Sequence, residues 1–313
     1  MNKLKYYVLC SSNIAATKRH LLYIPKDSLI IVLNSTDQEY TSVAESWCKE
    51  QDIEHYITKS DGTPATGKNS VMKLFLNSDN DFMVLVDGDD FITPHGVVVY
   101  DKISQMYNPP DAVAITNQFG LVPREDVYDK GCSIRYARDE NNPDNIHGKG
   151  VRCYHHSKEW WMEGLAGRLY SKDISVIHKR FISYIYQYMD QKETHLRITF
   201  YSKKAATYQF NNKFVVGEDT IQYYDIKNAW ATGNLNLQHL DDRYPSYVYD
   251  QRLSGIVGES SKSPKSFKTW LKKLVVKLDE MNEDNVLHTN QPPTIKVEFD
   301  KEYKPDVLGL VVQ

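Results

Sequence analysis

The residues best suited to chemistry are three aspartates, Asp87, Asp89 and Asp90, which follow a short apolar run. The run, residues 82–86, predicts a buried strand of an α/β sheet. Strand ends in open α/β sheets face the region where ligands bind. Crowded carboxylates repel one another unless a cation lies among them, and hard oxygen ligands suit Mg²⁺ or Mn²⁺. We therefore predict a Mg²⁺ or Mn²⁺ site here, with Gly88 allowing a tight turn and close approach to a ligand. The alternative is an acidic surface turn.

Three stretches together resemble one known family. Val86-Asp87-Gly88-Asp89-Asp90 followed by Pro94 resembles the D-x-D-D…P signature of family 2 glycosyltransferases. Residues 164–170 resemble a second element of that family, and Glu218-Asp219 after Gly217 resembles a third. The matches occur in order, and the resemblance covers about residues 5–258. It implies the GT-A fold, a Rossmann-like mixed sheet flanked by helices, together with a divalent metal and a UDP-sugar donor.

The acidic pair Glu218-Asp219 is the predicted catalytic element. In inverting enzymes of the family, the aspartate of this pair is the general base. A carboxylate opposite the donor diphosphate can take the proton of the acceptor hydroxyl as its oxygen attacks the anomeric carbon. The resemblance therefore assigns catalysis to Asp219, with Glu218 beside it. The alternative is an acidic helix N-terminus with no catalytic role.

The resemblance also assigns residues to the donor nucleotide. Residues 62–70 match a loop that leads into a helix over the donor, so Asp61 would face the base, and Lys68 and Asn69 the ribose or phosphates. The same residues nearly spell a P-loop, but Asn69 stands where a P-loop needs Ser or Thr. His239 is a weaker candidate metal ligand. The full set of predicted donor-binding residues is Ser11, Asn34, Asp61, Lys68, Asn69, Asp87 and Arg252.

Acceptor binding is assigned to an aromatic, glycine-containing stretch and to the polar segment before it. The segment 117–158 is predicted to be irregular, and such insertions often bind substrates. Two cysteines and two histidines at 132, 153, 155 and 156 match no zinc spacing. The predicted acceptor residues are Trp160, Trp161, Gly167, Arg168 and Tyr170.

Composition narrows the class of protein. The 313 residues carry a formal net charge of -3, so no strongly basic nucleic-acid binder is predicted from bulk charge. No apolar run is long enough for a membrane span, and none has the form of a signal peptide. The four cysteines show no disulfide or C-x-x-C pattern, which suits a reducing cytoplasm, the host's cytoplasm if the chain is encoded by a phage.

Two domains are predicted. Residues 1–258 would form the catalytic domain, with a donor half to about 116 and an acceptor half from 117. Residues 259–313 would form an extension with a basic amphipathic helix over 264–278. Predicted strands are 6–10, 29–33, 53–58, 82–86, 112–116, 196–201, 214–216, 247–249 and 294–299. Predicted helices are 14–23, 43–48, 70–76, 97–107 and 181–189, and another begins at 218.

The acceptor hypothesis rests on the extension and on composition. In its high content of Tyr, Asn and Lys the chain is similar to proteins of large virulent phages. Such phages use arabinosyl- or glucosyl-type glycosyltransferases to modify hydroxymethylcytosine in their DNA. Lysines of the 264–278 helix could contact a duplex backbone. The alternatives are a saccharide of a surface glycan as acceptor, or an inactive or P-loop-like nucleotide-binding module.

Overall fold

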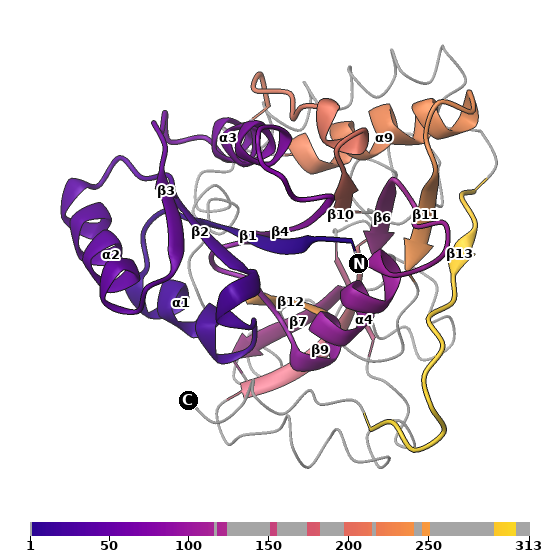
Figure 1. Ribbon diagram of the computed structural model, residues 1–313, viewed down its shortest axis with the longest axis horizontal. Helices are drawn as coiled ribbons and strands as arrows, with labels where there is room; N and C mark the ends of the chain where they lie inside the picture. Colours follow the sequence, from indigo (N-terminus) through magenta and orange to yellow (C-terminus); the bar gives the residue numbers. More distant parts are fainter. Residues whose placement is uncertain are drawn as a thin grey trace.

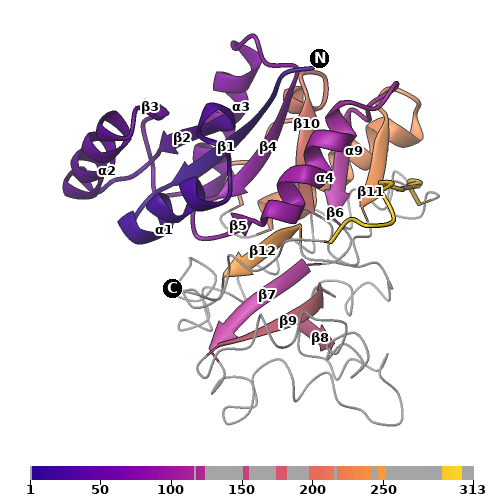
Figure 2. The ribbon, with the colours of Figure 1, turned by 60° about the horizontal axis from the view of Figure 1, so that its bottom comes forward.

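The computed structural model describes residues 2–115, 118–123, 151–154, 174–181, 197–214, 217–240, 246–250 and 291–304. In these residues the chain forms an eight-stranded sheet in the order β13-β11-β6-β10-β4-β1-β2-β3 and a five-stranded sheet in the order β5-β12-β7-β9-β8 (Figure 1, Figure 2). Helices flank the larger sheet. The predicted mixed α/β sheet flanked by helices is thus confirmed.

The larger sheet contains one reversed strand. The strands β1, β2, β3, β4, β6, β11 and β13 run parallel, while β10 is antiparallel to both of its neighbours, β4 and β6. Because of this reversal, the first residue of β10 lies beside the C-terminal end of β4. The strands of the larger sheet are β1 (Leu4–Cys10), β2 (Leu29–Leu33), β3 (Glu54–Ile57), β4 (Phe82–Asp87), β6 (Ala112–Ile115), β10 (Arg197–Ser202), β11 (Leu237–Leu240) and β13 (Thr294–Ile295).

The helices cover both faces of this sheet (Figure 1). The helices α3 and α9 pack on one face, and α1, α2 and α4 pack on the other. Their bounds are α1 (Ile14–Arg19), α2 (Gln38–Glu50), α3 (Pro64–Leu76), α4 (Pro94–Ser104) and α9 (Glu218–Ala231), with short 3₁₀ turns η1 (His20–Leu22), η2 (Lys26–Ser28) and η4 (Ala205–Thr207).

Alternating side chains build one core on each face. On β4, Met83 and Leu85 join the core under α3 and α9, while Val84 and Val86 join the core under α2 and α4. This is the period of two that a strand imposes. Both cores are apolar, so the run 82–86 is a buried strand, as predicted.

The smaller sheet shows where the sequence prediction was wrong. Residues 117–158 were predicted to be irregular, yet they contain β7 (Gln118–Pro123) and β8 (Val151–Tyr154), both of which pair with β9 (Ile174–Phe181). Their partners come from distant parts of the chain, so local composition gave no indication of them. The sheet is completed by β5 (Phe91–Ile92) and β12 (Tyr247–Asp250).

Several boundaries also differ from the prediction. Helix α3 begins at Pro64 instead of residue 70, and α4 begins at Pro94 instead of 97. A proline suits the first position of a helix, whose N–H has no partner there. Asp37 caps α2 by accepting from the backbone amides at positions 39 and 40.

The end of the described chain adds to the larger sheet. β13 falls within the predicted extension and pairs with β11, which itself lies mainly in a stretch predicted as loop. β13 ends at Ile295, although a strand to residue 299 was predicted. Of the strand predicted over 214–216, Phe214 lies outside any strand, and residues 215–216 are outside the described residues. The helix predicted over 264–278 is also outside the described residues. So is the helix predicted over 181–189, apart from Phe181, which lies in β9. Among the described residues, no helix has the length and apolar character needed to cross a membrane.

Candidate metal and base site

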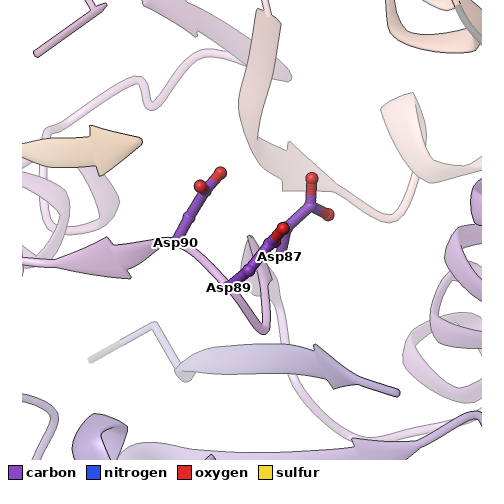
Figure 3. A group of neighbouring side chains, drawn as sticks. All are labelled: Asp87, Asp89 and Asp90. Atoms are coloured by element: carbon purple, nitrogen blue, oxygen red, sulfur yellow. The ribbon is translucent and has the colours of Figure 1, made fainter. Parts of the chain in front are cut away.

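The three predicted metal-binding aspartates lie together at the end of β4. We call residues 87–90 the acidic turn. One carboxylate oxygen from each of Asp87, Asp89 and Asp90 lies within 4.8 Å of the others, and the three side chains rise on the same side of the turn (Figure 3). The sequence prediction that these carboxylates are brought together is confirmed.

Gly88 allows this turn to lie against β1. Its N–H donates to the carbonyl oxygen of Leu9 at 2.7 Å. A Cβ at this position would be 2.5 Å from the same oxygen, closer than real Cβ atoms approach. The close approach that we expected toward a ligand is therefore made to the backbone of the neighbouring strand.

Two consecutive residues of α1 and η1 hold the backbone of the acidic turn. Arg19 Nη2 donates to the carbonyl oxygens of Asp89 and Asp90 at 3.1 and 3.4 Å, and its guanidinium lies 4.3 Å from the ring of Phe91. His20 Nε2 donates to the carbonyl oxygen of Gly88 at 3.2 Å. Burial, reinforced by the charge of Arg19 and opposed by this hydrogen bond, lowers the pKa of His20 to about 3. The turn is thus fixed by a neutral histidine and a cation.

A second cation, Arg197, approaches the aspartate side chains. It is the first residue of β10, and its Nη1 lies 3.2 Å from Asp90 Oδ2 and its Nη2 2.9 Å from Asp87 Oδ2. The hydroxyl of Tyr247 on β12 donates to Asp90 Oδ2 at 2.7 Å and accepts from the N–H of Asp87 at 3.3 Å. Burial and the charge of Asp89 raise the pKa of Asp90, and Arg197 opposes them. Asp90 is fully buried and bonded to protein groups on this side.

The remaining oxygens of the acidic turn fit a divalent cation. Asp87 Oδ1 is buried with no hydrogen-bond partner. Asp89 makes no ion pair and no side-chain hydrogen bond with another residue in the described part of the chain. Burial and Asp87 raise its pKa. Uncompensated carboxylate oxygens from two residues, with a third carboxylate within reach, are a donor set that Mg²⁺ or Mn²⁺ accepts.

The acidic pair Glu218-Asp219 forms the N-terminus of α9. Gly217 precedes it with φ of 90°, a left-handed conformation that glycine adopts without strain. The positive end of the helix dipole favours the two carboxylates in the first turn. Glu218 is buried, and this burial raises its pKa, while Lys68 opposes the shift.

Lys68 connects the acidic pair with the acidic turn. Its Nζ lies 2.9 Å from Glu218 Oε1, 2.7 Å from Asp219 Oδ1 and 3.6 Å from Asp87 Oδ2. Its side chain is only 2% exposed. Burial alone would lower its pKa, but the charges of Asp219, Asp87 and Glu218 raise it above the ordinary value of a lysine. The carboxylates at 87, 218 and 219 therefore share one buried ammonium group.

The position of Lys68 corrects the predicted loop. Residues 64–70 lie within α3, so Gly67 and Lys68 are helical and form no P-loop around a phosphate. Asn69 makes a reciprocal pair of hydrogen bonds with the backbone of Phe210, both of 2.8 Å. These contacts tie α3 to the segment that leads toward α9.

The other predicted donor residues surround the C-terminal ends of β1, β2 and β3. Ser11 directly follows β1 and is exposed. Asn34 donates to Thr58 Oγ1 at 2.8 Å and to the carbonyl oxygen of Lys59 at 3.1 Å. Asp61 is exposed and accepts hydrogen bonds from Thr63 and Thr66 at the start of α3, which lower its pKa. Their contacts with a nucleotide stay predictions.

Other predicted residues are not brought to this site. His239 lies on β11, three strands from β4 and so about 14 Å away at the usual spacing of strands. Its Nε2 is bonded to the hydroxyl of Tyr223 at 3.0 Å. The structure thus gives no support for His239 as a ligand at the acidic turn. Predicted residues outside the described part are Arg252, Trp160, Trp161, Gly167, Arg168 and Tyr170.

Sequence reasoning missed four residues of the site. Arg197 and Tyr247 contact the aspartates directly, and Arg19 and His20 hold the turn. Arg197 begins an apolar strand, where a buried charge needs a partner, and this was the one available indication. The other three occur in unremarkable local sequence, and only the fold reveals their contacts.

Comparisons with known proteins complete the description. No family model and no curated protein matches the sequence. Among solved structures, S. aureus TarS is 16% identical, with 87% of this chain and 39% of that chain covered and a TM-score of 0.42. TarS residues 1–349 in complex with UDP are 16% identical, with coverages of 90% and 69% and a TM-score of 0.44. The mannosyltransferase PcManGT from Pyrobaculum calidifontis, in complex with GDP-Man and Mn²⁺, is 13% identical, with coverages of 86% and 68% and a TM-score of 0.38. The chain thus spans well under half of the full TarS structure.

Proposed function

We propose that this protein is a metal-dependent inverting glycosyltransferase that moves a sugar from a UDP-sugar to an acceptor hydroxyl. One observation carries the proposal. A cluster of three aspartates at a strand end lies next to a second carboxylate pair at a helix N-terminus, and Lys68 contacts both groups within 3.6 Å. Such an arrangement supplies a place for a diphosphate-bound cation and a separate carboxylate for the acceptor.

The residues that would hold the cation are Asp89 and Asp87, the latter through its unbonded Oδ1. Asp90 would complete the carboxylate set while its Oδ2 stays bonded to Arg197 and Tyr247. A bound Mg²⁺ or Mn²⁺ would stabilise the negative charge on the leaving diphosphate. In this proposal the acidic turn therefore acts on the diphosphate of the sugar donor.

Asp219 is the proposed general base. The acceptor oxygen would form a bond to the anomeric carbon while the bond from that carbon to the diphosphate oxygen breaks, so UDP leaves and the configuration inverts. Asp219 would take the proton of the acceptor hydroxyl. Its side chain is 20% exposed, whereas that of Glu218 is 8% exposed. An acceptor can thus reach Asp219 more easily, and Glu218 is the supporting member of the pair.

The proposed acceptor is 5-hydroxymethylcytosine in duplex DNA, and a saccharide hydroxyl is the alternative. This part of the proposal comes from the composition and from the lysines of residues 264–278, which lie outside the described residues. A base in duplex DNA would have to leave the stack to reach Asp219, at a cost of a few kcal/mol. A P-loop-like nucleotide binder is not supported, since Lys68 lies inside a helix.

The deciding experiment is a release assay for UDP with Mn²⁺ present. UDP-linked hexoses and pentoses would each be combined with free saccharides, lipid-linked saccharides, and duplexes with and without hydroxymethylcytosine. We expect UDP release to rise with one acceptor and to require the cation. Release with a saccharide alone would remove the DNA acceptor and keep the enzyme class. Donor binding with no transfer to any acceptor would favour an inactive binding module.

A further inference from the structure

Lys68 is buried among carboxylates that come from two separate elements. Glu218 and Asp219 belong to α9, and Asp87 ends β4. The lysine itself lies on α3, which covers the same face of the sheet as α9 (Figure 1). Its ring contact with Phe210, 5.3 Å from Nζ to the centroid, places further protein over the ammonium group. A buried lysine is costly unless several partners satisfy it, so its position is closely determined.

We propose that Lys68 is a positioning residue that couples the acidic pair to the cation site. Its hydrogen bond to Asp219 sets where that carboxylate lies relative to the acidic turn, and its charge competes with the cation for Asp87. This inference rests on the proposed function for the role of Asp219 in transfer, but its effect on the cation does not.

The first consequence concerns the affinity for the cation. Lys68 Nζ is 3.6 Å from Asp87 Oδ2, so it places a positive charge beside a predicted ligand. Replacing it by a neutral residue removes this repulsion and should tighten binding of Mn²⁺ by about fivefold or more, the worth of a unit charge about 4 Å away even in water. A lysine that only supported the fold would instead loosen the site when removed.

The second consequence concerns turnover. Asp219 Oδ1 is held 2.7 Å from Nζ, and loss of that bond would let the carboxylate move. A displacement of about 1 Å of a reacting group can cost about a hundredfold in rate. At a saturating concentration of Mn²⁺ the KM for the donor should change little while kcat falls, because Lys68 lies within a helix and contacts carboxylates. A fall in kcat at an unchanged KM would indicate that Lys68 positions Asp219 for the acceptor.

The test uses the full chain with Lys68→Met/Glu218→Gln as the central variant. Lys68→Met alone would leave buried carboxylates without a partner and threaten folding. The second change removes one of those charges, so the net charge of the cluster is unchanged, and the affinity of the double variant for Mn²⁺ is therefore compared with that of Glu218→Gln alone. Binding of Mn²⁺ alone is measured by the EPR signal of the free ion, and Asp89→Asn identifies the part of the binding that belongs to the acidic turn. Lys68→Arg/Glu218→Gln returns the positive charge and should bind Mn²⁺ as Glu218→Gln does.

A matched control is Lys203→Met. Lys203 is a half-buried lysine that bonds the carbonyl oxygens of Phe75 and Ser78, the latter at 2.7 Å, away from the carboxylate cluster. We expect it to leave both the affinity for Mn²⁺ and turnover unchanged.

Tighter Mn²⁺ binding in the double variant than in Glu218→Gln, reversed in Lys68→Arg/Glu218→Gln, supports the coupling, and a fall in kcat at constant KM supports the positioning role. Mn²⁺ binding that is no tighter in the folded double variant than in Glu218→Gln overturns the proposal. If the wild type transfers no sugar but the Mn²⁺ result holds, the proposed function fails while the coupling stands.

Discussion

Arg197 Nη1 lies 3.2 Å from Asp90 Oδ2, and the two side chains are only 6% and 0% exposed. The pair joins the first residue of β10 to the acidic turn, and Tyr247 adds a hydrogen bond of 2.7 Å to the same oxygen. The arrangement of the three clustered carboxylates therefore depends on a residue more than a hundred positions away in the sequence.

Arg197→Met should lower the free energy of unfolding by about 3–5 kcal/mol, because it removes the buried cation that Asp90 and Asp87 both contact. Arg197→Met/Asp90→Asn should recover part of this loss, since the buried charge is also removed. Urea unfolding followed by circular dichroism measures both. If the single and double variants are equally destabilised, the loss comes from packing and not from the ion pair.

Asp89→Asn should abolish metal-dependent transfer and weaken Mn²⁺ binding, while stability is kept or slightly raised. Asp89 is crowded by Asp87, and burial already raises its pKa, so removing its charge relieves repulsion. The exposed residue Asp79 offers a control, and Asp79→Asn should leave the affinity unchanged. Full activity in EDTA would show that the acidic turn holds no essential cation.

Asp219→Asn should lower turnover by about 10²–10⁴-fold, the usual worth of a general base. Binding of the UDP-sugar should be preserved, because Asp219 lies on α9 and not on the acidic turn. Single-turnover rates and donor binding by calorimetry separate the two effects. Equal losses of donor affinity and turnover would identify Asp219 as a structural cap.

Gly88→Ala should destabilise the protein by about 1–3 kcal/mol, the usual cost of forcing extra volume into a packed site. The added Cβ would lie 2.5 Å from the carbonyl oxygen of Leu9 and 2.9 Å from Cys10 Cα, both backbone atoms that cannot turn aside. The turn must then move from β1, so Mn²⁺ binding should weaken as well. Unchanged values of both quantities would show that the turn can shift without cost.

Stability should fall between pH 7 and pH 5 because two buried histidines resist protonation. Burial, then Arg19, lowers the pKa of His20 to about 3, and burial, then Lys227, lowers that of His239 to about 4. Below about pH 6.5 the unfolded chain binds these protons and the folded chain does not, so each histidine should cost about 2 kcal/mol by pH 5.

The matching test compares each wild-type histidine with a side chain that does not titrate. His20→Asn and His239→Gln should each be less stable at pH 7 but should lose about 2 kcal/mol less on acidification to pH 5. Denaturant titrations at both pH values give the difference. An acid loss equal to that of the wild type would contradict the assignment for that histidine.

The local part of this structure could be predicted from the sequence. The buried strand over 82–86, the aspartate cluster that follows it and the helix beginning at Glu218 all occur as expected, because each depends on neighbouring residues. Two features could not be predicted, because long-range packing sets them. They are the pairing of β7, β8 and β9 and the contacts of Arg197. Lys68 was predicted to contact the ribose or phosphates of the donor, whereas the structure shows that the helix beginning at Pro64 brings it to carboxylates.

The register of β10 has a consequence for how this fold can change. Arg197, where the chain re-enters the larger sheet, is the direct partner of Ile115, where the chain leaves it. The exit and the re-entry are therefore neighbours, and the described strands between them, β7, β8 and β9, belong to the smaller sheet. The pairing of β6 with β10 therefore sets no length for the segment that joins Ile115 to Arg197, whereas β7 within it pairs with β12, which carries Tyr247 of the site. The chain between these two strands can therefore change in length without any change in the register of the larger sheet.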